Sequence, residues 1–405
     1  MARLKKESAN PTAPSGAVDL QAGIDKLLAI AAKSKEIVLR VSDAPNTWRY
    51  LDFVDITAPG RPCLPMEYFF GTRGLLCGRV VHFTAEEATG KSSVIYLLYG
   101  MVQRTGGAWM MHYETESAIA PPDFIYHLGC DPGKLLSNKP HSVNECLTHA
   151  ETWIQTVRAN VDPDRKLPII LGIDSVSGLA AGDMNLDTGE SDGDASLGKH
   201  AREFAKFFRE KLDYVERQDA LVLASAQLKA NINTDPKRGG NPGKKHSSIA
   251  EGAFKYHASW IVEMNHWRLE EDGFNVGERI MLTTIKNKLS GKGRTMELHL
   301  YRDRPMAWDF TKANTDLLFG SYSPLPAGKF ASGGGWYKCD GVGDGKNMRA
   351  EDFVNAFYAN AALVMECRER LKIRGFGFKF EKDYMPTDDT DDVPVPPQLP
   401  EAKNG

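Results

Sequence analysis

Strand-like and helix-like segments alternate along residues 59–319, and this pattern predicts a mostly parallel sheet flanked by helices. Helical patterns follow Lys91 and cover residues 143–158 and 198–216. The expected fold class is therefore α/β. The expected strands are residues 79–84, 108–113, 167–173, 220–225, 260–264, 280–286 and 296–301.

The regions on either side of this core have a different character. Residues 18–32 carry apolar side chains at helical spacing, which predicts a short N-terminal helix. A glycine-rich break at 332–335 precedes a helical pattern over 350–371, and beyond residue 380 a proline-rich segment with four clustered aspartates is expected to be disordered. The expected division is a helical arm over 1–58, a core over 59–329, a small C-terminal domain over 330–380 and an acidic tail over 381–405.

Two long polar segments interrupt the core. Residues 181–196 are dominated by Gly, Asp, Asn, Thr, Ser and Glu, and residues 228–250 carry several cations among glycines and prolines. Loops of this length inside a compact domain are usually functional or mobile. The cations of the second segment are Lys229, Lys237, Arg238, Lys244 and Lys245.

Composition narrows the class of protein. With 42% hydrophobic and 25% charged residues, the chain is neither a disordered chain, nor a collagen, nor a small disulfide scaffold. Lys and Arg number 50 against 53 Asp and Glu, so that any binding of nucleic acid must come from a local patch. The six cysteines form no CxxC pair, which disfavours a zinc site and a disulfide framework and favours a reducing compartment. Apolar runs are too short to span a bilayer, so a cytoplasmic protein with no membrane partner is expected.

The most specific motif is Ala-Glu-Glu-Ala-Thr-Gly-Lys-Ser at residues 85–92, which follows an expected strand and precedes an expected helix. This context is typical of a phosphate-binding loop, whose backbone N–H groups surround the phosphates. Lys91 is expected to reach the β- and γ-phosphates, and Ser92 to bind Mg²⁺. Ala85 stands where the motif usually has its first glycine. The loop residues expected to bind the nucleotide are Glu86, Glu87, Ala88, Thr89, Gly90, Lys91, Ser92 and Ser93.

Two further strand ends carry carboxylates. The apolar strand 168–173 leads into Asp174, which has the pattern of the second metal ligand of a nucleotide site. The strand 108–113 leads into Glu114-Thr-Glu116, where a carboxylate can orient the attacking water. Either glutamate alone is equally consistent with a solvated strand end.

Taken together, these segments resemble the RecA family of recombinases over residues 17–371. Residues 73–80 resemble the stretch before the phosphate loop of that family, and Glu116 falls where the family has its catalytic glutamate. Residues 224–227 resemble the strand that ends in the γ-phosphate-sensing glutamine, here Gln227. Lys286 and Lys288 resemble the lysine pair that reaches the ATP of a neighbouring subunit, and residues 334–337 resemble the start of the C-terminal domain.

The resemblance implies a RecA-like core that binds ATP and Mg²⁺, with a short N-terminal helical arm and a small α/β C-terminal domain. It also implies a DNA-dependent ATPase that forms a helical filament of its own copies on single-stranded DNA and exchanges strands with a homologous double-stranded DNA. A bacterial cell, or one infected by a phage, is the implied location.

Several residue roles are carried over on the same resemblance. Phe124 stands where the family has a tyrosine that stacks on adenine. Arg202 and Arg209 keep the family's spacing from Gln227, and their separation of seven places them on one helical face. The residues expected to contact DNA are Leu197, Gly198, Arg202, Arg209, Lys229, Lys237, Arg238, Lys244 and Lys245.

Two other functions are open from sequence. One is a DNA motor on the same fold, which the Lys286 and Lys288 pair disfavours. The other is a DNA-binding filament that no longer hydrolyses ATP, suggested by Ala85 and disfavoured by the presence of Lys91, Ser92, Asp174 and Glu116.

Overall fold

The computed structural model describes residues 49–58, 60–116, 120–180, 196–230, 246–248, 250–326 and 329–374. The expected N-terminal helix, the acidic tail and the greater part of both polar loops lie outside the described residues. The loop cations Lys237, Arg238, Lys244 and Lys245 lie outside them as well.

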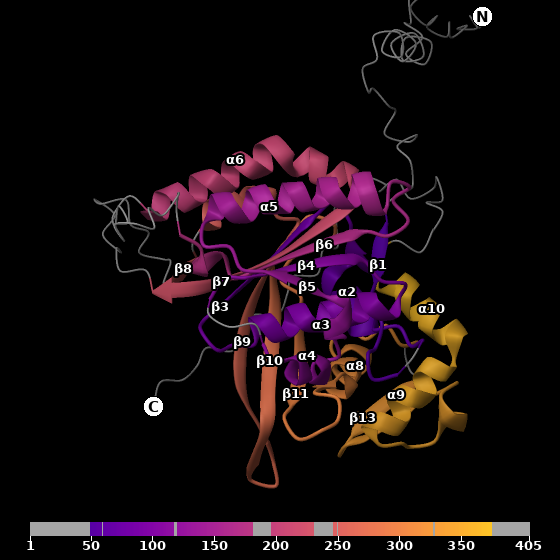
Figure 1. Ribbon diagram of the computed structural model, residues 1–405. Helices are drawn as coiled ribbons and strands as arrows, with labels where there is room; N and C mark the ends of the chain where they lie inside the picture. Colours follow the sequence, from indigo (N-terminus) through magenta and orange to yellow (C-terminus); the bar gives the residue numbers. More distant parts are fainter. Residues whose placement is uncertain are drawn as a thin grey trace, which may run out of the picture. The chain divides into compact units, whose positions relative to one another are not determined.

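A ten-stranded sheet forms the centre of the fold, and the expected α/β class with a mostly parallel sheet is confirmed (Figure 1). Neighbouring strands from β9 to β5 are parallel, whereas the three edge strands β10, β11 and β12 run antiparallel to their neighbours. The order across the sheet is β12 (Trp308–Asp309), β11 (Thr295–Tyr301), β10 (Phe274–Asn287), β9 (Trp260–Glu271), β3 (Val80–Ala85), β7 (Ala220–Ala230), β6 (Ile169–Asp174), β4 (Trp109–Glu114) and β5 (Leu136–Asn138), with β8 (His246–Ser248) paired to β7.

Helices cover both faces of this sheet (Figure 1). One apolar core lies between the sheet and α2 (Leu64–Phe70), α3 (Lys91–Arg104) and α4 (Pro122–His127). A second core lies between the opposite face and α5 (Val143–Thr156), α6 (Ser196–Arg217) and α7 (Glu251–His257). Since both faces are covered, every residue of β3 and β6 is buried, which explains why β6 is an apolar run up to Asp174.

Aromatic side chains hold the second helical layer together. The ring centroids of Phe204 and Phe208 on α6 lie 5.3 and 5.2 Å from that of Phe254 on α7. Such aromatic pairs stabilise a core beyond the effect of their buried area. Their packing fixes which face of α6 points outward, and Arg202 and Arg209 lie on that exposed face.

All seven expected strands are present, but several boundaries differ. Strand β7 continues to Ala230 and pairs there with β8. Residues 228–230 and 246–248, which were expected to belong to the second polar loop, are therefore strand residues. Strand β9 extends to Glu271, seven residues beyond the expected end, because β10 supplies backbone hydrogen bonds where β9 is mostly exposed and polar. No apolar alternation marks that extension in the sequence.

The helix expected over 350–371 is two helices. Asn360 separates α9 (Ala350–Ala359) from α10 (Ala361–Arg370), and its side chain accepts a hydrogen bond from the Leu363 N–H at 3.1 Å. Its amide also donates to the Gly341 carbonyl at 2.9 Å. Asparagine is a strong helix N-cap, and the continuous apolar spacing of the segment concealed this break.

The remaining elements build the C-terminal part of the described chain and the edges of the core. Helix α8 (Thr311–Phe319), strands β13 (Phe330–Gly333) and β14 (Trp336–Cys339), and the helices α9 and α10 share an apolar cluster that also includes Leu64 of α2. Strands β1 (Tyr50–Asp52) and β2 (Gly74–Leu76) pair separately. Short 3-10 turns cover Pro132–Lys134, Val176–Gly178 and Gly343–Gly345, and a π-helical turn covers Val157–Val161.

All six cysteines are buried and free, so the expectation of no disulfide framework is confirmed. Within the described ranges, no helix combines the length and the apolar composition that crossing a bilayer requires.

A buried ion pair joins α10 to α2. The Arg368 guanidinium donates to both Glu67 carboxylate oxygens, with the Nε to Oε2 distance at 2.8 Å, and the two side chains are 12% and 2% exposed. Burial raises the pKa of Glu67, and the charge of Arg368 opposes that shift. The pair therefore holds α10 against α2. Removal of either side chain would leave the other as a buried charge without a partner, which strongly destabilises the fold.

We predict that Arg368→Ala lowers the free energy of unfolding by about 3–5 kcal/mol, because it leaves the Glu67 carboxylate buried without its cation. Arg370→Ala is the matched control on the same helix, since its exposed pair with Glu366 is worth about 0.5 kcal/mol or less. Chemical denaturation of the two variants measures the difference. Equal stability losses would show that the Glu67 pair does not anchor α10.

Candidate nucleotide site

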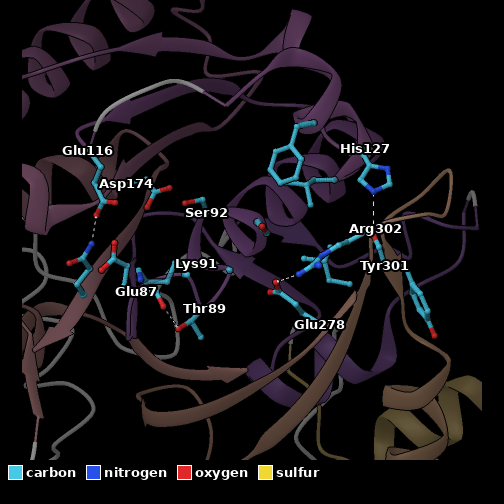
Figure 2. Close-up of a pocket in the computed structure, with 17 residues that line it drawn as sticks. Glu87, Thr89, Lys91, Ser92, Glu116, His127, Asp174, Glu278, Tyr301 and Arg302 are labelled. Carbon is cyan, nitrogen blue, oxygen red and sulfur yellow. Dashed lines mark hydrogen bonds and ion pairs between the residues drawn. The ribbon is translucent and has the colours of Figure 1, made fainter. Parts of the chain in front are cut away.

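A cavity of about 540 Å³ opens at the carboxyl ends of the parallel strands, and most of the predicted nucleotide-binding residues line it. In Figure 2, Glu116 and Asp174 lie toward one end, His127, Tyr301 and Arg302 toward the other, and Lys91 and Ser92 between them. The predicted residues on its wall are Glu87, Ala88, Thr89, Gly90, Lys91, Ser92, Ser93, Glu116, Phe124, Asp174 and Gln227.

The phosphate loop connects β3 to α3. Gly90 caps α3 with a positive φ of 83°, a conformation that suits glycine, and a Cβ there would lie 2.8 Å from Ile280 of β10. Thr89 Oγ1 donates to the Glu86 carbonyl at 2.9 Å, which closes the turn. The first turn of α3, whose N–H groups have no partner within the helix, lies at the cavity, since Lys91, Ser92 and Ser93 line it.

Lys91 is held at the centre of this loop. Its ammonium donates to the Glu86 carbonyl at 2.7 Å, and the residue is 8% exposed. Burial lowers the pKa of Lys91, while the carboxylates of Asp174, Glu116 and Glu87 oppose this shift. A buried cation near a helix N-terminus is suited to bind an anion such as a polyphosphate.

Three strand ends place their polar side chains within hydrogen-bonding distance of one another. Asp174 at the end of β6 accepts from the Ser225 hydroxyl of β7. Glu116, just beyond β4, accepts from the Ser175 hydroxyl and, at 3.0 Å, from the side-chain amide of Gln227 on β7. The expected catalytic carboxylate and the expected sensor glutamine are thus in direct contact.

Oxygen ligands suitable for Mg²⁺ face the same space. Asp174 is 5% exposed, and both Asp174 and the exposed Ser92, the two residues expected to bind Mg²⁺, line the cavity. His112 and Glu114 also lie beside Asp174, with one possible ligand atom from each of the three within 4.8 Å of the others. Glu114 has a second contact, because its Oε1 accepts the Glu116 backbone N–H at 3.1 Å and so positions Glu116.

The opposite end of the cavity comes largely from residues that the sequence did not single out for this role. His127 and Leu128 follow Phe124 at the end of α4, and Phe124 is 44% exposed. Arg302 just beyond β11 donates to Glu278 of β10 at 3.0 Å. The only sequence signal for this end is Phe124, because β10 and β11 carry no motif here. The residues that sequence analysis missed are His127, Leu128, Glu278, Leu300, Tyr301 and Arg302.

The lysine pair lies outside the cavity of its own chain. Lys286 and Lys288 donate to the carbonyl of Tyr256 at the C-terminal end of α7, each at 3.3 Å, and Lys286 also donates to that of Lys255. Burial and then the charge of Lys288 lower the pKa of Lys286 to about 8.

The expected DNA-contacting residues are only partly described. Leu197 and Gly198 fall in the first turn of α6, and Lys229 lies on β7, where it is paired with Ser247 of β8. Arg202 and Arg209 occupy the exposed face of α6. Burial lowers the pKa of His257, and the nearby charges of Lys288, Arg209 and Lys286 lower it further. One cationic region therefore joins α6 to the lysine pair.

Several known proteins are similar in sequence to this chain. Residues 51–306 match the RecA N-terminal domain. The chain is 24% identical over 348 residues to Protein RecA of Gluconacetobacter polyoxogenes, which covers 82% of this chain and 88% of that protein. It is 24% identical over 314 residues to Protein RecA of Rhodospirillum centenum, covering 76% and 77%, and 25% identical over 309 residues to that of Acidiphilium cryptum, covering 74% and 80%.

We predict that two substitutions at this site separate nucleotide binding from hydrolysis. Lys91→Ala removes the cation beside the phosphates and weakens ATP binding about 10- to 100-fold. Glu116→Gln keeps ATP affinity within about threefold but lowers hydrolysis about 10²- to 10⁴-fold, because only activation of the attacking water is lost. Calorimetric titration and phosphate release measure the two effects.

Glu270 is an exposed carboxylate on β9. The substitution Glu270→Gln is the matched control, and it leaves both ATP affinity and the hydrolysis rate unchanged. Near-normal hydrolysis in Glu116→Gln would remove Glu116 from the catalytic role.

Proposed function

Because the chain belongs to the RecA family, we propose that it is an ATP-dependent recombinase that polymerises on single-stranded DNA and pairs it with a homologous duplex. The observation that carries this proposal is the convergence of Lys91, Ser92, Asp174, Glu116 and Gln227 on one cavity. A protein of this fold that did not hydrolyse ATP would not need these five side chains in one cavity.

The residues present fit a magnesium-bound nucleoside triphosphate. The buried ammonium of Lys91 and the first turn of α3 supply positive charge for the β- and γ-phosphates. Ser92 and Asp174 supply oxygen ligands of the kind that Mg²⁺ prefers, and the ion neutralises phosphate charge when bound. Glu116 orients water at the γ-phosphate end, because it is the carboxylate held beside Gln227.

Gln227 links this chemistry to DNA. Its amide contacts Glu116, and the next residue along the chain, Leu228, already pairs with Ser248 of β8. The second polar loop therefore leaves from and returns to the sheet immediately beyond the glutamine. A change at the γ-phosphate that displaces the Gln227 side chain acts directly on the base of this loop, which is the kind of segment that nucleotide-driven switches order and release.

The lysine pair suits a role between subunits. Lys286 and Lys288 lie outside the nucleotide cavity of their own chain. In their described hydrogen bonds, the two ammonium groups donate only to backbone carbonyls of α7. These partners are neutral carbonyls, and no carboxylate of the described residues is among the hydrogen-bond partners of either ammonium. We propose that in the filament they bind the phosphates of the ATP held by the neighbouring subunit.

We predict that Lys286→Ala loses DNA-stimulated hydrolysis but retains ATP affinity as a monomer, since its own cavity is intact. A mixture of Lys286→Ala and Lys91→Ala subunits forms some interfaces with an intact loop on one side and intact lysines on the other. The mixture therefore hydrolyses more ATP in the presence of single-stranded DNA than either variant alone.

Lys312→Ala, an exposed lysine on α8 with its own partner Asp316, serves as the control. If Lys286→Ala failed to bind ATP as a monomer, the lysines would act in their own subunit. If the wild-type chain coated single-stranded DNA without hydrolysing ATP, it would be a structural filament.

We predict that Arg202→Ala and Arg209→Ala weaken single-stranded DNA binding with little dependence on sequence. Each variant also makes the log–log salt dependence of binding shallower, by about 0.7 for every phosphate that the arginine neutralises in the wild-type chain. Arg217→Ala at the far end of α6, where the arginine pairs with Asp213, is the matched control. An unchanged slope in both variants, measured by fluorescence anisotropy across a salt series, would exclude this face of α6 from the DNA path.

A further inference from the structure

An ion pair lies on the cavity wall away from the catalytic carboxylates. Arg302 Nη2 donates to Glu278 Oε1 at 3.0 Å, the side chains are 61% and 25% exposed, and both residues line the cavity. They come from two neighbouring antiparallel strands, because Glu278 is paired with Leu300, two residues before Arg302. The backbone N–H of Arg302 also bonds the Val276 carbonyl at 3.0 Å, so its position is set by the sheet.

The direction of a bound nucleotide follows from the positions of the other groups. Lys91 and Ser92 hold the phosphates, and Glu116 with Gln227 marks the γ-phosphate end. The nucleoside must then extend away from Glu116, and in Figure 2 that direction leads to His127 and Arg302. The exposed ring of Phe124 lines the same cavity and offers a surface for a base.

We propose that Arg302, held by Glu278, is a specificity-determining residue that packs its planar guanidinium on the nucleoside portion of the bound ATP. This inference rests on the proposed function only in requiring that the cavity bind a nucleotide. The guanidinium is a planar, delocalised cation that can stack on the face of a purine. Its positive charge is also attracted to the π-system of the base.

Contact with the nucleoside is favoured over contact with the phosphates for two reasons. The carboxylate of Glu278 already compensates the charge of Arg302, which reduces its attraction for phosphate but leaves the flat faces of the guanidinium available. Lys91, Ser92 and the N-terminus of α3 already provide the phosphate contacts at the centre of the cavity.

The test compares ATP with inorganic tripolyphosphate, each with Mg²⁺, as competitors of a fluorescent ATP analogue on the full-length chain. Arg302→Ala is expected to weaken ATP binding about five- to tenfold and to leave tripolyphosphate binding unchanged. Arg302→Lys keeps the positive charge but lacks the planar guanidinium. It is therefore expected to recover less than half of the ATP affinity that Arg302→Ala loses. Arg279→Ala is the matched control, because Arg279 is an exposed arginine on β10 that lies outside the cavity wall.

Three results would overturn the proposal: equal losses of affinity for ATP and tripolyphosphate in Arg302→Ala, unchanged ATP affinity in that variant, or full recovery by Arg302→Lys. The first would place Arg302 on the phosphates. Hydrolysis and DNA are not part of the measurement, so a wild-type chain that binds ATP but shows no DNA-stimulated hydrolysis would contradict the proposed function while the comparison of variants stands.

Discussion

The register of four parallel strands determines where the phosphate loop, Glu116, Asp174 and Gln227 lie. Glu114 is paired with Asp174, and Ala85 with Gln227, so the phosphate loop and the three polar strand ends leave the sheet at one edge. A slip of one residue would turn each strand's side chains to the opposite face. The two apolar cores on either side of the sheet oppose that slip, because each side chain would then have to pack into the core on the opposite face, whose space it does not match. The precision of the site therefore derives from packing remote from it.

A hydrogen-bonded network connects these strand ends. Thr115 Oγ1 accepts the Ser175 N–H at 2.8 Å, which ties β4 to β6, and Glu116 then contacts Ser175 and Gln227, which brings in β7. Ser177 on the turn after β6 accepts the backbone N–H of Gln227 at 2.9 Å. In such a network each bond orients the next, so a ligand that draws Glu116 or Gln227 toward a γ-phosphate alters the whole edge of the sheet. The network therefore joins the cavity residue Glu116 to the part of β7 that pairs with β8.

Sequence was sufficient where a local pattern carries the information. Buried parallel strands appear as apolar runs, and the phosphate loop and the carboxylate at Asp174 stand at fixed places beside them, so the core strands and the phosphate end of the site were predicted. The other end was not, because Glu278 and Arg302 come from different strands and are brought together only by cross-strand pairing. The same limit applies to the outer half of β9, where hydrogen bonds to β10 replace the apolar alternation that would have marked a strand.

Strand β10 connects the nucleotide cavity to the lysine pair. Ile280 and Leu282 belong to the core on the phosphate-loop side, and a regular pleat would place Lys286, which has the same parity, on that side too. The register of β10 against β9 instead shifts between Thr284 and Lys286, and the Lys286 ammonium contacts the end of α7 on the opposite side of the sheet. A β-bulge that re-aims one side chain thus allows a single strand to present Glu278 to its own nucleotide cavity and Lys286 away from it, about 27 Å along the strand. Residues 278–283 are paired with both β9 and β11, so the regular part of β10 sets the position of Glu278, whereas the bulge beyond it sets the direction of Lys286.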